Sequence, residues 1–353
     1  MRIKKLECRN FRNIEAEILV PCAEMNVICG ENAQGKTNFL EAIWLFTGAK
    51  SFRGAKDSEF VRLGKEKADI SIDFISQEIE QTAKIEIKEK RFAYLNEKKL
   101  KSAHELAGTF NAVIFSPSDL KTVSEGPSNR RKFLDTAIGQ IYPAYIETLK
   151  NYARAVTQRN RIIKDLRYDS TVSVMLDIFE EEIVKNGIKI ISARKKYTQE
   201  INKFLENIYF GISSGKEVLD TDYKSCGSES FSEKLKNARK EDMYSGITSI
   251  GPHRDDLEFR INGINARSFA SQGQKRSVSL SLKLAEAEVI KKKTGESPCF
   301  LLDDVMSELD PQRQNYILNR IEGIQAFITC CDPLNIKNLT GGKTFSIKEG
   351  KII

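Results

Sequence analysis

The feature that most constrains this chain is a glycine-rich segment close to its N-terminus. A largely apolar run at residues 25–29 precedes the segment, and a second apolar run with helical spacing follows it at residues 39–44. The segment fits the pattern G-x-x-x-x-G-K-[ST] without a mismatch, and this pattern requires a strand before it and a helix after it. Its residues are Gly30, Glu31, Asn32, Ala33, Gln34, Gly35, Lys36 and Thr37, followed by Asn38. The sequence therefore predicts a phosphate-binding loop (P-loop).

A P-loop binds phosphate through backbone amides and one lysine. Glycines allow the chain to turn its N–H groups inwards, and the N-terminus of the following helix adds partial positive charge. We expect Lys36 to contact the β- and γ-phosphates of a nucleotide such as ATP, and Thr37 to bind Mg²⁺. The motif alone does not identify the function, because kinases, motors, switches and transporter ATPases share it.

Composition narrows the class of protein. The chain has 353 residues, 40% of them hydrophobic, which is enough for one large domain or two ordinary ones. Its net charge of +7 fits either an anionic partner or an even spread of lysines. The seven cysteines contain no C-x-x-C pair and there are two histidines, so we expect reduced thiols and no His/Cys metal cluster. No run approaches the roughly 18 apolar residues of a membrane span, and we expect a cytoplasmic protein without a membrane partner.

The secondary-structure pattern divides the chain into three segments. Strand patterns dominate residues 1–115, helical patterns dominate residues 116–246, and strands return in residues 247–353. We therefore expect an α/β fold, in which the first and third segments build a P-loop ATPase lobe with a mixed sheet and a β-rich N-terminal part. The middle segment would be an inserted, mainly helical second lobe. Pro143 and the polar residues 169–171 interrupt the helical pattern, so no long coiled coil is expected.

Individual elements follow from the same periodicities. The expected strands are residues 2–8, 14–20, 25–29, 70–75, 83–87, 91–95, 111–115, 257–261, 264–269, 298–302, 326–330 and 344–348. Helices are expected at residues 275–293 and 311–322, and residues 211–246 are expected to be loops with one short helix.

Two basic segments are candidates for contact with a polyanion such as DNA. The first is the loop after the P-loop helix, with Lys50, Arg53 and Lys56. The second is one face of a helix in the middle segment, which carries four cations and no acid opposite an apolar face. These four residues are Lys150, Arg154, Arg161 and Lys164. Either segment can also be an ordinary solvated surface.

An apolar strand that ends in two acids, Asp303 and Asp304, provides what a P-loop protein needs beside its loop. We expect Asp303 to bind Mg²⁺ directly or through water. Asp304 is then placed to orient or deprotonate the attacking water, or to support the metal ligand.

A second phosphate-binding surface is predicted where a long helix begins. Ser271, Gln272, Gly273 and Gln274 combine a hydroxyl group, a flexible glycine and a helix N-terminus, which together suit a γ-phosphate. One compact chain cannot readily hold one nucleotide with both this surface and its P-loop. We therefore expect two ATP molecules to bridge a two-fold homodimer. The alternative is that residues 271–274 are simply the capped N-terminus of an ordinary helix.

The order of these motifs resembles the ATPase heads of ABC-type proteins of the SMC kind. Further blocks along the chain resemble the RecF family of bacterial recombination and gap-repair ATPases. The matching blocks are residues 10–13, 30–38, 115–120, 126–135, 251–256 and 271–274. Blocks in this order, without a coiled-coil insertion, are specific to that family.

The resemblance implies a homodimer that binds ATP together with double-stranded and gapped DNA, works with RecR and RecO, and helps RecA to load. It implies that Lys36, Thr37, Asp303 and Asp304 bind and hydrolyse nucleotide, and that Ser271 and Gly273 contact the ATP of the other protomer. Arg12 and Asn13 match a position that borders the nucleotide. Residues 307–310 would join the two sites.

The chain departs from the wider ABC pattern in two ways. The usual glutamate after the Mg²⁺-binding aspartate is Asp304, and no histidine follows His253, so the switch histidine expected near residues 329–331 is missing. Both differences favour slow hydrolysis, because misplacing a catalytic base by about 1 Å can cost about a hundredfold in rate. A transporter ATPase subunit, which usually has Leu-Ser-Gly-Gly-Gln and the histidine, and a small-molecule kinase are the alternatives.

A last cluster has an ambiguous role. Arg130, Arg131 and the His253-Arg254 pair could contact a ligand, but they could also form ion pairs between the two lobes with acids such as Asp255 and Asp256.

Overall fold

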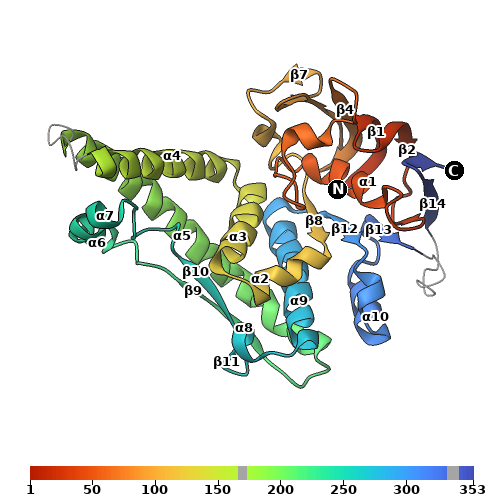
Figure 1. The fold of residues 1–353 in the computed structure, drawn as a ribbon. Helices are drawn as coiled ribbons and strands as arrows, with labels where there is room; N and C mark the ends of the chain where they lie inside the picture. Colours follow the sequence, from red (N-terminus) through yellow and green to blue (C-terminus); the bar gives the residue numbers. More distant parts are fainter. Residues whose placement is uncertain (166–172, 332–341) are drawn as a thin grey trace.

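The computed structural model describes residues 1–165, 173–331 and 342–353, which form two lobes (Figure 1). Lobe I contains an antiparallel sheet with the strand order β2-β1-β4-β5-β6-β7. Its strands are β1 (Arg2–Phe11), β2 (Ile14–Leu19), β4 (Ala68–Ser76), β5 (Ile79–Ile87), β6 (Arg91–Leu95) and β7 (Lys98–Lys99). Every second residue of β4 is buried, as expected for a sheet with one face against a core.

The second sheet of lobe I is mixed and has the order β15-β14-β3-β13-β12-β8. Its strands are β3 (Met25–Cys29), β8 (Ala112–Phe115), β12 (Cys299–Asp303), β13 (Ala326–Cys330), β14 (Lys343–Lys348) and β15 (Lys351–Ile352). All are parallel except β15. Helix α1 (Lys36–Leu45) lies between the two sheets, and its apolar residues share one core with both (Figure 1). The continuous apolar runs of β12 and β13 reflect burial on both faces.

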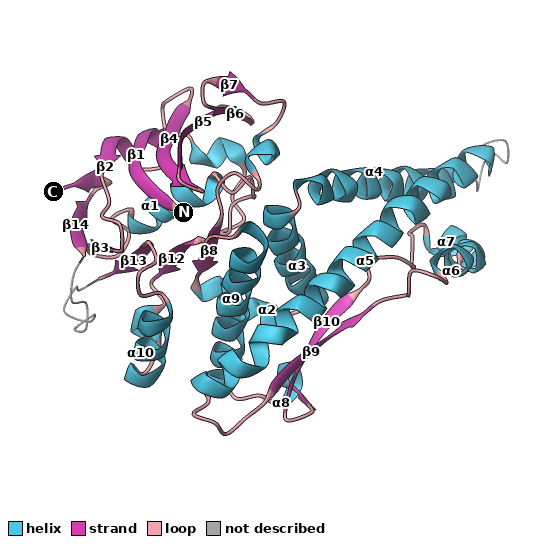
Figure 2. Cartoon of the chain, turned by 180° about the vertical axis from the view of Figure 1, so that it is seen from behind, coloured by secondary structure: helices cyan, strands magenta, loops and turns pink. Residues whose placement is uncertain are grey.

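Lobe II is mainly helical, as predicted. Its helices are α2 (Leu120–Ser124), α3 (Pro127–Ile141), α4 (Pro143–Asp165), α5 (Ser173–Ile212), α6 (Phe231–Asn237), α7 (Arg239–Ser245), α8 (Ala266–Phe269) and α9 (Gln272–Thr294). Although α5 has 40 residues, α4 and α5 diverge from their shared tip and form no long coiled coil (Figures 1 and 2). The predicted break at residues 169–171 lies outside the described residues. Helix α10 (Pro311–Arg320) follows β12 in lobe I.

Two local predictions were wrong. Residues 211–246 contain strand β9 (Leu219–Lys224) and the two short helices α6 and α7 instead of loops with one helix. The expected strand at 264–269 ends after β11 (Ile264–Asn265), because the Asn265 side chain accepts a hydrogen bond from Ser268 N and starts α8. The remaining strand pairs antiparallel with β10 (Asp256–Ile261) to form a hairpin.

The pairing of β9 with β10 bears on the expected boundary at residues 246 and 247. These antiparallel strands lie on opposite sides of that boundary and belong to one three-stranded sheet, β11-β10-β9. The sheet packs against α5 through β9 and against α3 through β10. We therefore propose that lobe II continues beyond residue 246 and includes α9, which packs against α5.

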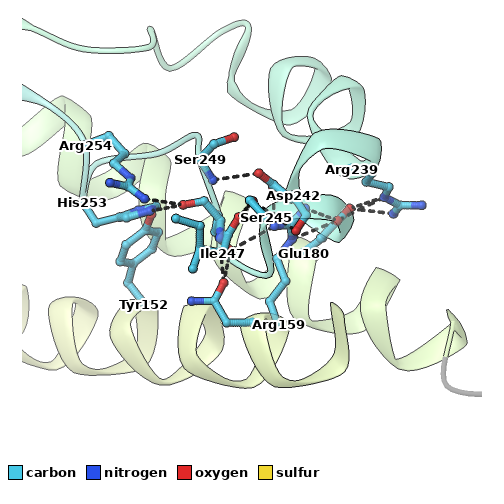
Figure 3. A network of polar contacts seen from close by, with 12 residues as sticks. Tyr152, Arg159, Glu180, Arg239, Asp242, Ser245, Ile247, Ser249, His253 and Arg254 are labelled. Atoms are coloured by element: carbon cyan, nitrogen blue, oxygen red, sulfur yellow. Dashed lines mark hydrogen bonds and ion pairs between the residues drawn. The ribbon is translucent and has the colours of Figure 1, made fainter. Parts of the chain in front are cut away.

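A buried arginine fixes the tip of lobe II. Arg159 of α4 has 0% exposure and donates to Glu180 of α5 at 3.0 Å and to Asp242 of α7 at 2.6 Å (Figure 3). Its Nη1 atom also donates to Thr248 Oγ1 at 2.9 Å. Arg159 therefore connects α4, α5 and α7, although it interrupts the face of α4 that the sequence marks as apolar.

Two of the ambiguous arginines, Arg130 and Arg131, make hydrogen bonds within lobe II. Arg130 Nε and Nη2 donate to the two carboxylate oxygens of Asp256 at 2.6 and 2.9 Å, and Arg131 donates to the backbone oxygen of Asp255 at 2.7 Å. The predicted ion pair of Arg130 is confirmed for Asp256, but with β10 assigned to lobe II it joins parts of one lobe and not the two lobes. His253 contacts Tyr152 at 2.6 Å and Thr248 O at 2.9 Å, so it too joins elements of the lobe (Figure 3).

Candidate nucleotide site

The predicted P-loop connects β3 to α1, at the edge where the parallel strands end. Two of its positions require glycine. Gly30 has φ 153°, and a Cβ atom there would lie 2.3 Å from Ile347 O; Gly35 has φ 104°, and a Cβ atom would lie 2.5 Å from Asn13 Oδ1. A larger side chain at Gly30 would displace the backbone of β14, and one at Gly35 would displace the Asn13 side chain, so the pattern seen in the sequence has a steric cause.

The Lys36 ammonium group is held at the loop. Lys36 is 7% exposed, and Nζ donates to Gly30 O at 2.5 Å and Glu31 O at 2.9 Å. Cys331 Sγ accepts a third, longer contact at 3.7 Å. A buried ammonium group that is satisfied by weak neutral acceptors is available for a stronger, charge-assisted bond to phosphate.

Thr37 and Asp303 meet beside the loop although they are far apart in the sequence. Strands β3, β13 and β12 are adjacent and parallel, so their carboxyl ends lie at one edge. Thr37 Oγ1 donates to Asp303 Oδ1 at 2.7 Å, and Thr329 Oγ1 donates to the same oxygen at 3.0 Å. Burial raises the pKa of Asp303, and these two hydrogen bonds oppose the shift.

These oxygens suit Mg²⁺. The cation prefers hard oxygen ligands and usually takes one or two protein groups together with substrate phosphates and water. A hydroxyl group from Thr37 and a carboxylate from Asp303 match that requirement. No group of three or more His, Cys, Asp or Glu side chains suited to a metal occurs in the described parts of the chain. Phosphate oxygens and water would complete the coordination of a cation held there.

Asp304 follows Asp303 in an unusual backbone conformation. Its φ is 53°, in the left-handed region that non-glycine residues rarely occupy. Asp304 N donates to Thr329 Oγ1 at 2.9 Å, and Ser307 Oγ donates to Asp304 O at 2.9 Å. Strained conformations of this kind cluster at functional sites. The threonine that supports Asp303 thus also fixes the backbone of Asp304.

The turn between β1 and β2 borders the P-loop. Asn13 Nδ2 donates to Gln34 O at 3.1 Å, and Asn13 Oδ1 accepts from Asn38 Nδ2 at 2.8 Å. Gln34 also accepts from the backbone N–H groups of Glu349 at 2.6 Å and Gly350 at 2.8 Å. The turn after β1 and the turn after β14 therefore both hold the loop, which a local sequence pattern does not reveal.

Glu41 carries a buried carboxylate whose role was not predicted from the sequence. It lies on α1 with 0% exposure and accepts from Arg12 Nε at 3.1 Å and Nη2 at 2.9 Å, both on Oε2. Ser51 Oγ donates to the other oxygen, Oε1, at 2.5 Å. The sequence does show an acidic residue inside the apolar run that forms α1, and this residue could have indicated a buried ion pair. Glu41 joins the turn at Arg12, the P-loop helix and the loop that carries Ser51.

The loop that carries Ser51 also carries Arg53, whose guanidinium group contacts residues of the P-loop helix. Arg53 Nη1 donates to Asn38 Oδ1 at 3.1 Å and lies 3.7 Å from Glu41 Oε2. Its positive charge also opposes the raised pKa of Asp303. Arg53 was predicted to be a DNA contact, but the structure brings it to the nucleotide end of the loop. Lys50 and Lys56 are exposed on the same loop, and all four cations of the α4 stripe are exposed.

The second predicted phosphate surface lies elsewhere. Ser271 caps α9: its Oγ accepts from Gln274 N at 3.2 Å, and Ser271 N donates to Gln274 Oε1 at 2.8 Å. Ser271 and Gln272 are exposed. Figure 1 places this end of α9 beside α8, at the end of lobe II that points away from α1. The structure thus does not bring Ser271, Gln272, Gly273 and Gln274 together with the P-loop of the same chain.

Comparisons with known proteins test the resemblance. Residues 2–347 match the family described as the RecF/RecN/SMC N-terminal domain. A relative from Clostridium acetobutylicum is 41% identical over 362 residues, covering 100% of this chain and 99% of the relative. A relative from Lachnoclostridium phytofermentans is 38% identical over 333 residues, covering 94% and 92% respectively. Both are called DNA replication and repair protein RecF. The chain belongs to the RecF family.

Solved structures agree with this membership. The recombination mediator protein RecF with ATP, from the RecFOR pathway, superposes on this chain with a TM-score of 0.93 at 36% identity, covering 100% of this chain and 97% of that one. An Smc head domain from Pyrococcus furiosus superposes with a TM-score of 0.57 at 17% identity, which shows a shared fold only. The expected fold, a P-loop ATPase head of the ABC and SMC type with a helical second lobe, is confirmed for this RecF-family chain. The described part of the chain contains no helix suited to crossing a membrane.

Proposed function

We propose that this RecF-family chain is an ATP-dependent DNA-binding protein of recombinational and replication-gap repair. In this proposal ATP closes a homodimer, the dimer binds double-stranded and gapped DNA, and slow hydrolysis resets it. The observation that carries the proposal is the separation of two phosphate-type surfaces, the P-loop and the N-terminus of α9, within one chain. Two copies related by a two-fold axis can bring each P-loop to the other copy's α9.

The geometry of α9 supports a role in binding phosphate. The first N–H groups of a helix have no partner within it, and the Ser271 hydroxyl group occupies only the amide of Gln274. The backbone amides of Gln272 and Gly273 therefore have no partner within this helix of 23 residues, which begins at an exposed position. Such a terminus attracts an anion through its N–H groups and its dipole.

Each residue of the P-loop side has a defined part in the proposed reaction. Lys36 neutralises the β- and γ-phosphates, while Thr37 and Asp303 hold Mg²⁺. The bound cation supplies positive charge to the phosphate oxygens. Asp304 orients the attacking water, and Arg12 and Asn13 line the nucleotide. We assign Lys36, Asp303 and Asp304 to catalysis on this basis.

Partner proteins follow from the family only. A related solved structure is described as part of the RecFOR pathway. We propose that this chain likewise acts with RecO and RecR, and through them helps RecA to load, at DNA gaps in the cytoplasm. The full-length match to RecF relatives makes a transporter subunit or a small-molecule kinase the weaker alternative.

The substitution Ser271→Arg tests the dimer. We expect the variant to bind ATP as the wild type does but to remain monomeric with ATP and Mg²⁺ in analytical ultracentrifugation. A large cation would fill the exposed helix terminus without touching the P-loop of its own chain. Ser245→Arg is the matched control, because Ser245 is also exposed but lies on α7. A dimer that forms equally well with Ser271→Arg would refute the proposed arrangement.

A further inference from the structure

A chain of side-chain hydrogen bonds connects the interior of lobe II to the N-terminus of α9. Tyr209, on α5, donates from its hydroxyl group to Glu217 Oε2 at 2.8 Å. Gln274, in the first turn of α9, donates from Nε2 to the other oxygen, Glu217 Oε1, at 2.7 Å. Gln274 Oε1 in turn accepts from Ser271 N at 2.8 Å. We call Tyr209, Glu217, Gln274 and Ser271 the cap network.

Glu217, at the centre of the cap network, lies on a loop whose backbone is held at two places. The loop joins α5 to β9, and Glu217 N donates to Oγ of Ser213, the first residue after α5, at 3.3 Å. The next residue, Val218, donates from N to Asn262 Oδ1 at 2.9 Å and accepts from Asn262 N at 2.9 Å. The carboxylate therefore extends from a loop that is fixed both to the end of α5 and to the turn between β10 and β11.

The tyrosine end of the network is buried. Tyr209 has 0% exposure and packs in the core that α5 shares with α9. Burial raises the pKa of Tyr209 well above its ordinary value, and the hydrogen bond to Glu217 raises it further. The hydroxyl group therefore keeps its proton and donates it to Glu217, which holds one carboxylate oxygen in a fixed place.

The carboxylate of Glu217 determines the orientation of the Gln274 amide. A carboxylate only accepts hydrogen bonds, whereas a glutamine amide donates from its nitrogen and accepts at its oxygen. Nε2 of Gln274 must therefore face Glu217, and this orientation turns Oε1 towards Ser271 N. Ser271 Oγ accepts from Gln274 N at 3.2 Å, so both halves of a capping box are made. Because Ser271 Oγ accepts in this bond, it keeps its own proton for another acceptor.

We propose that Glu217 is a positioning residue for the ATP that closes the dimer. It holds Gln274 so that Ser271 directs its hydroxyl proton to the γ-phosphate bound by the partner subunit's P-loop. The inference rests on the proposed function, in which the N-terminus of α9 meets that nucleotide. Glu217 acts through Gln274 and not on the nucleotide itself, because a carboxylate repels phosphate oxygens.

The substitution Glu217→Ala tests the inference in the full-length chain. We expect the dissociation constant of the ATP-bound dimer to rise about 100-fold in analytical ultracentrifugation, because a hydrogen bond to a charged group contributes at least about tenfold in affinity and the dimer contains two such sites. Binding of ATP to the monomer should stay unchanged, since the P-loop lies elsewhere in the chain. The matched control is Glu181→Ala, on an exposed glutamate near the opposite end of α5.

An exchange of two side chains separates positioning from a general effect on stability. In the double variant Glu217→Gln, Gln274→Glu, the new glutamine can accept from Tyr209 and donate to the new glutamate, whose second oxygen can accept from Ser271 N. Glutamate is also a usual partner of serine in a capping box. The exchange keeps the hydrogen bonds and the total charge of the cap network, so it should restore the dissociation constant to within about tenfold of the wild type. A double variant that dimerises no better than Glu217→Ala would overturn the inference.

The outcomes separate two failures. If the wild type does not dimerise with ATP and Mg²⁺, the proposed function fails. If the wild type dimerises and Glu217→Ala dimerises equally well, the positioning role is refuted while the proposed function stands. An equal loss in Glu181→Ala would also refute the role, because the effect would not depend on the cap network.

A further readout needs no variant. Hydrogen exchange of the wild type, followed by mass spectrometry with and without ATP and Mg²⁺, should become slower in residues 213–218 as well as in residues 271–277. The two segments should respond together because the cap network joins them. Slower exchange in residues 271–277 alone would overturn the inference even if Glu217→Ala did not fold.

Discussion

Replacing Glu41 with glutamine should weaken both the fold of lobe I and the binding of nucleotide. The carboxylate has 0% exposure, and Arg12, whose side chain is 19% exposed, makes two hydrogen bonds to one of its oxygens. Glutamine has nearly the same volume and can still offer one oxygen to Arg12, while its amide group faces Ser51. The change therefore removes the charge and leaves the packing intact.

The magnitude follows from the burial of the pair. Removing one partner of a buried ion pair costs about 3–5 kcal/mol, and a hydrogen bond to a charged group contributes about 1.5–3 kcal/mol. Because glutamine keeps one acceptor and Arg12 reaches solvent, we expect a loss of about 2–3 kcal/mol. Arg53 is 47% exposed at 3.7 Å and adds little. For a lobe of this size the loss corresponds to about 4–12 °C in melting temperature.

The assays are thermal unfolding and the binding of a fluorescent ATP analogue. We expect weaker nucleotide binding, because Glu41 holds the Arg12 turn and the Ser51 loop against the P-loop helix. Glu89→Gln is the control, since Glu89 is exposed and the substitution should change stability by about 0.5 kcal/mol or less. The double variant Arg12→Gln, Glu41→Gln should lose less than the sum of the single variants. If Glu41→Gln unfolds like the wild type, Glu41 does not act as the buried anchor inferred here.

Two further predictions concern the P-loop and the effect of pH. Gly30→Ala should abolish measurable ATP binding, because a Cβ atom at Gly30 would lie 2.3 Å from Ile347 O. Gly54→Ala is the control and should still bind ATP, because the space around Gly54 is open. Calorimetric titration with ATP measures both, and normal binding by Gly30→Ala would refute the steric argument. The folded protein should also lose stability as the pH falls from about 6.5 towards 4. In that range His104 takes up a proton in the unfolded chain but not in the folded protein, where burial lowers its pKa to about 4. Denaturant midpoints measured across this range should fall less steeply for His104→Gln, and an unchanged slope would contradict the assignment.

The parts of the site that could be predicted from sequence are those that one local pattern specifies. The P-loop needs glycine at Gly30 and Gly35 for steric reasons, and Asp303 ends a strand that is buried on both faces. Each signal lies within a few residues. Their meeting at one sheet edge follows from the rule that parallel strands end together, which the contact between Thr37 and Asp303 illustrates.

The parts that could not be predicted depend on contacts between distant segments. Glu41 becomes a centre of the site only because Arg12 and Ser51 reach it from separate segments. Strand β9 is polar and short, and its pairing with β10 decides its conformation more than its own composition does. In the sequence, Arg159 only interrupts an apolar helix face. In the fold, acidic residues of α5 and α7 accept its hydrogen bonds. Tertiary partners override local propensity in each case.

The segment after Asp304 connects the two phosphate surfaces of one chain. Arg276, in the first turns of α9, donates to Glu308 O at 3.2 Å, and Arg313 Nε donates to Ser277 Oγ at 3.0 Å. The N-terminus of α9 is therefore joined to the loop that begins at Asp304. In the proposed dimer this terminus holds the partner's nucleotide, whereas Asp304 acts on the nucleotide of its own chain. Each subunit would thus link the two sites through one helix and one loop, so that closure over one ATP also positions Asp304 at the other.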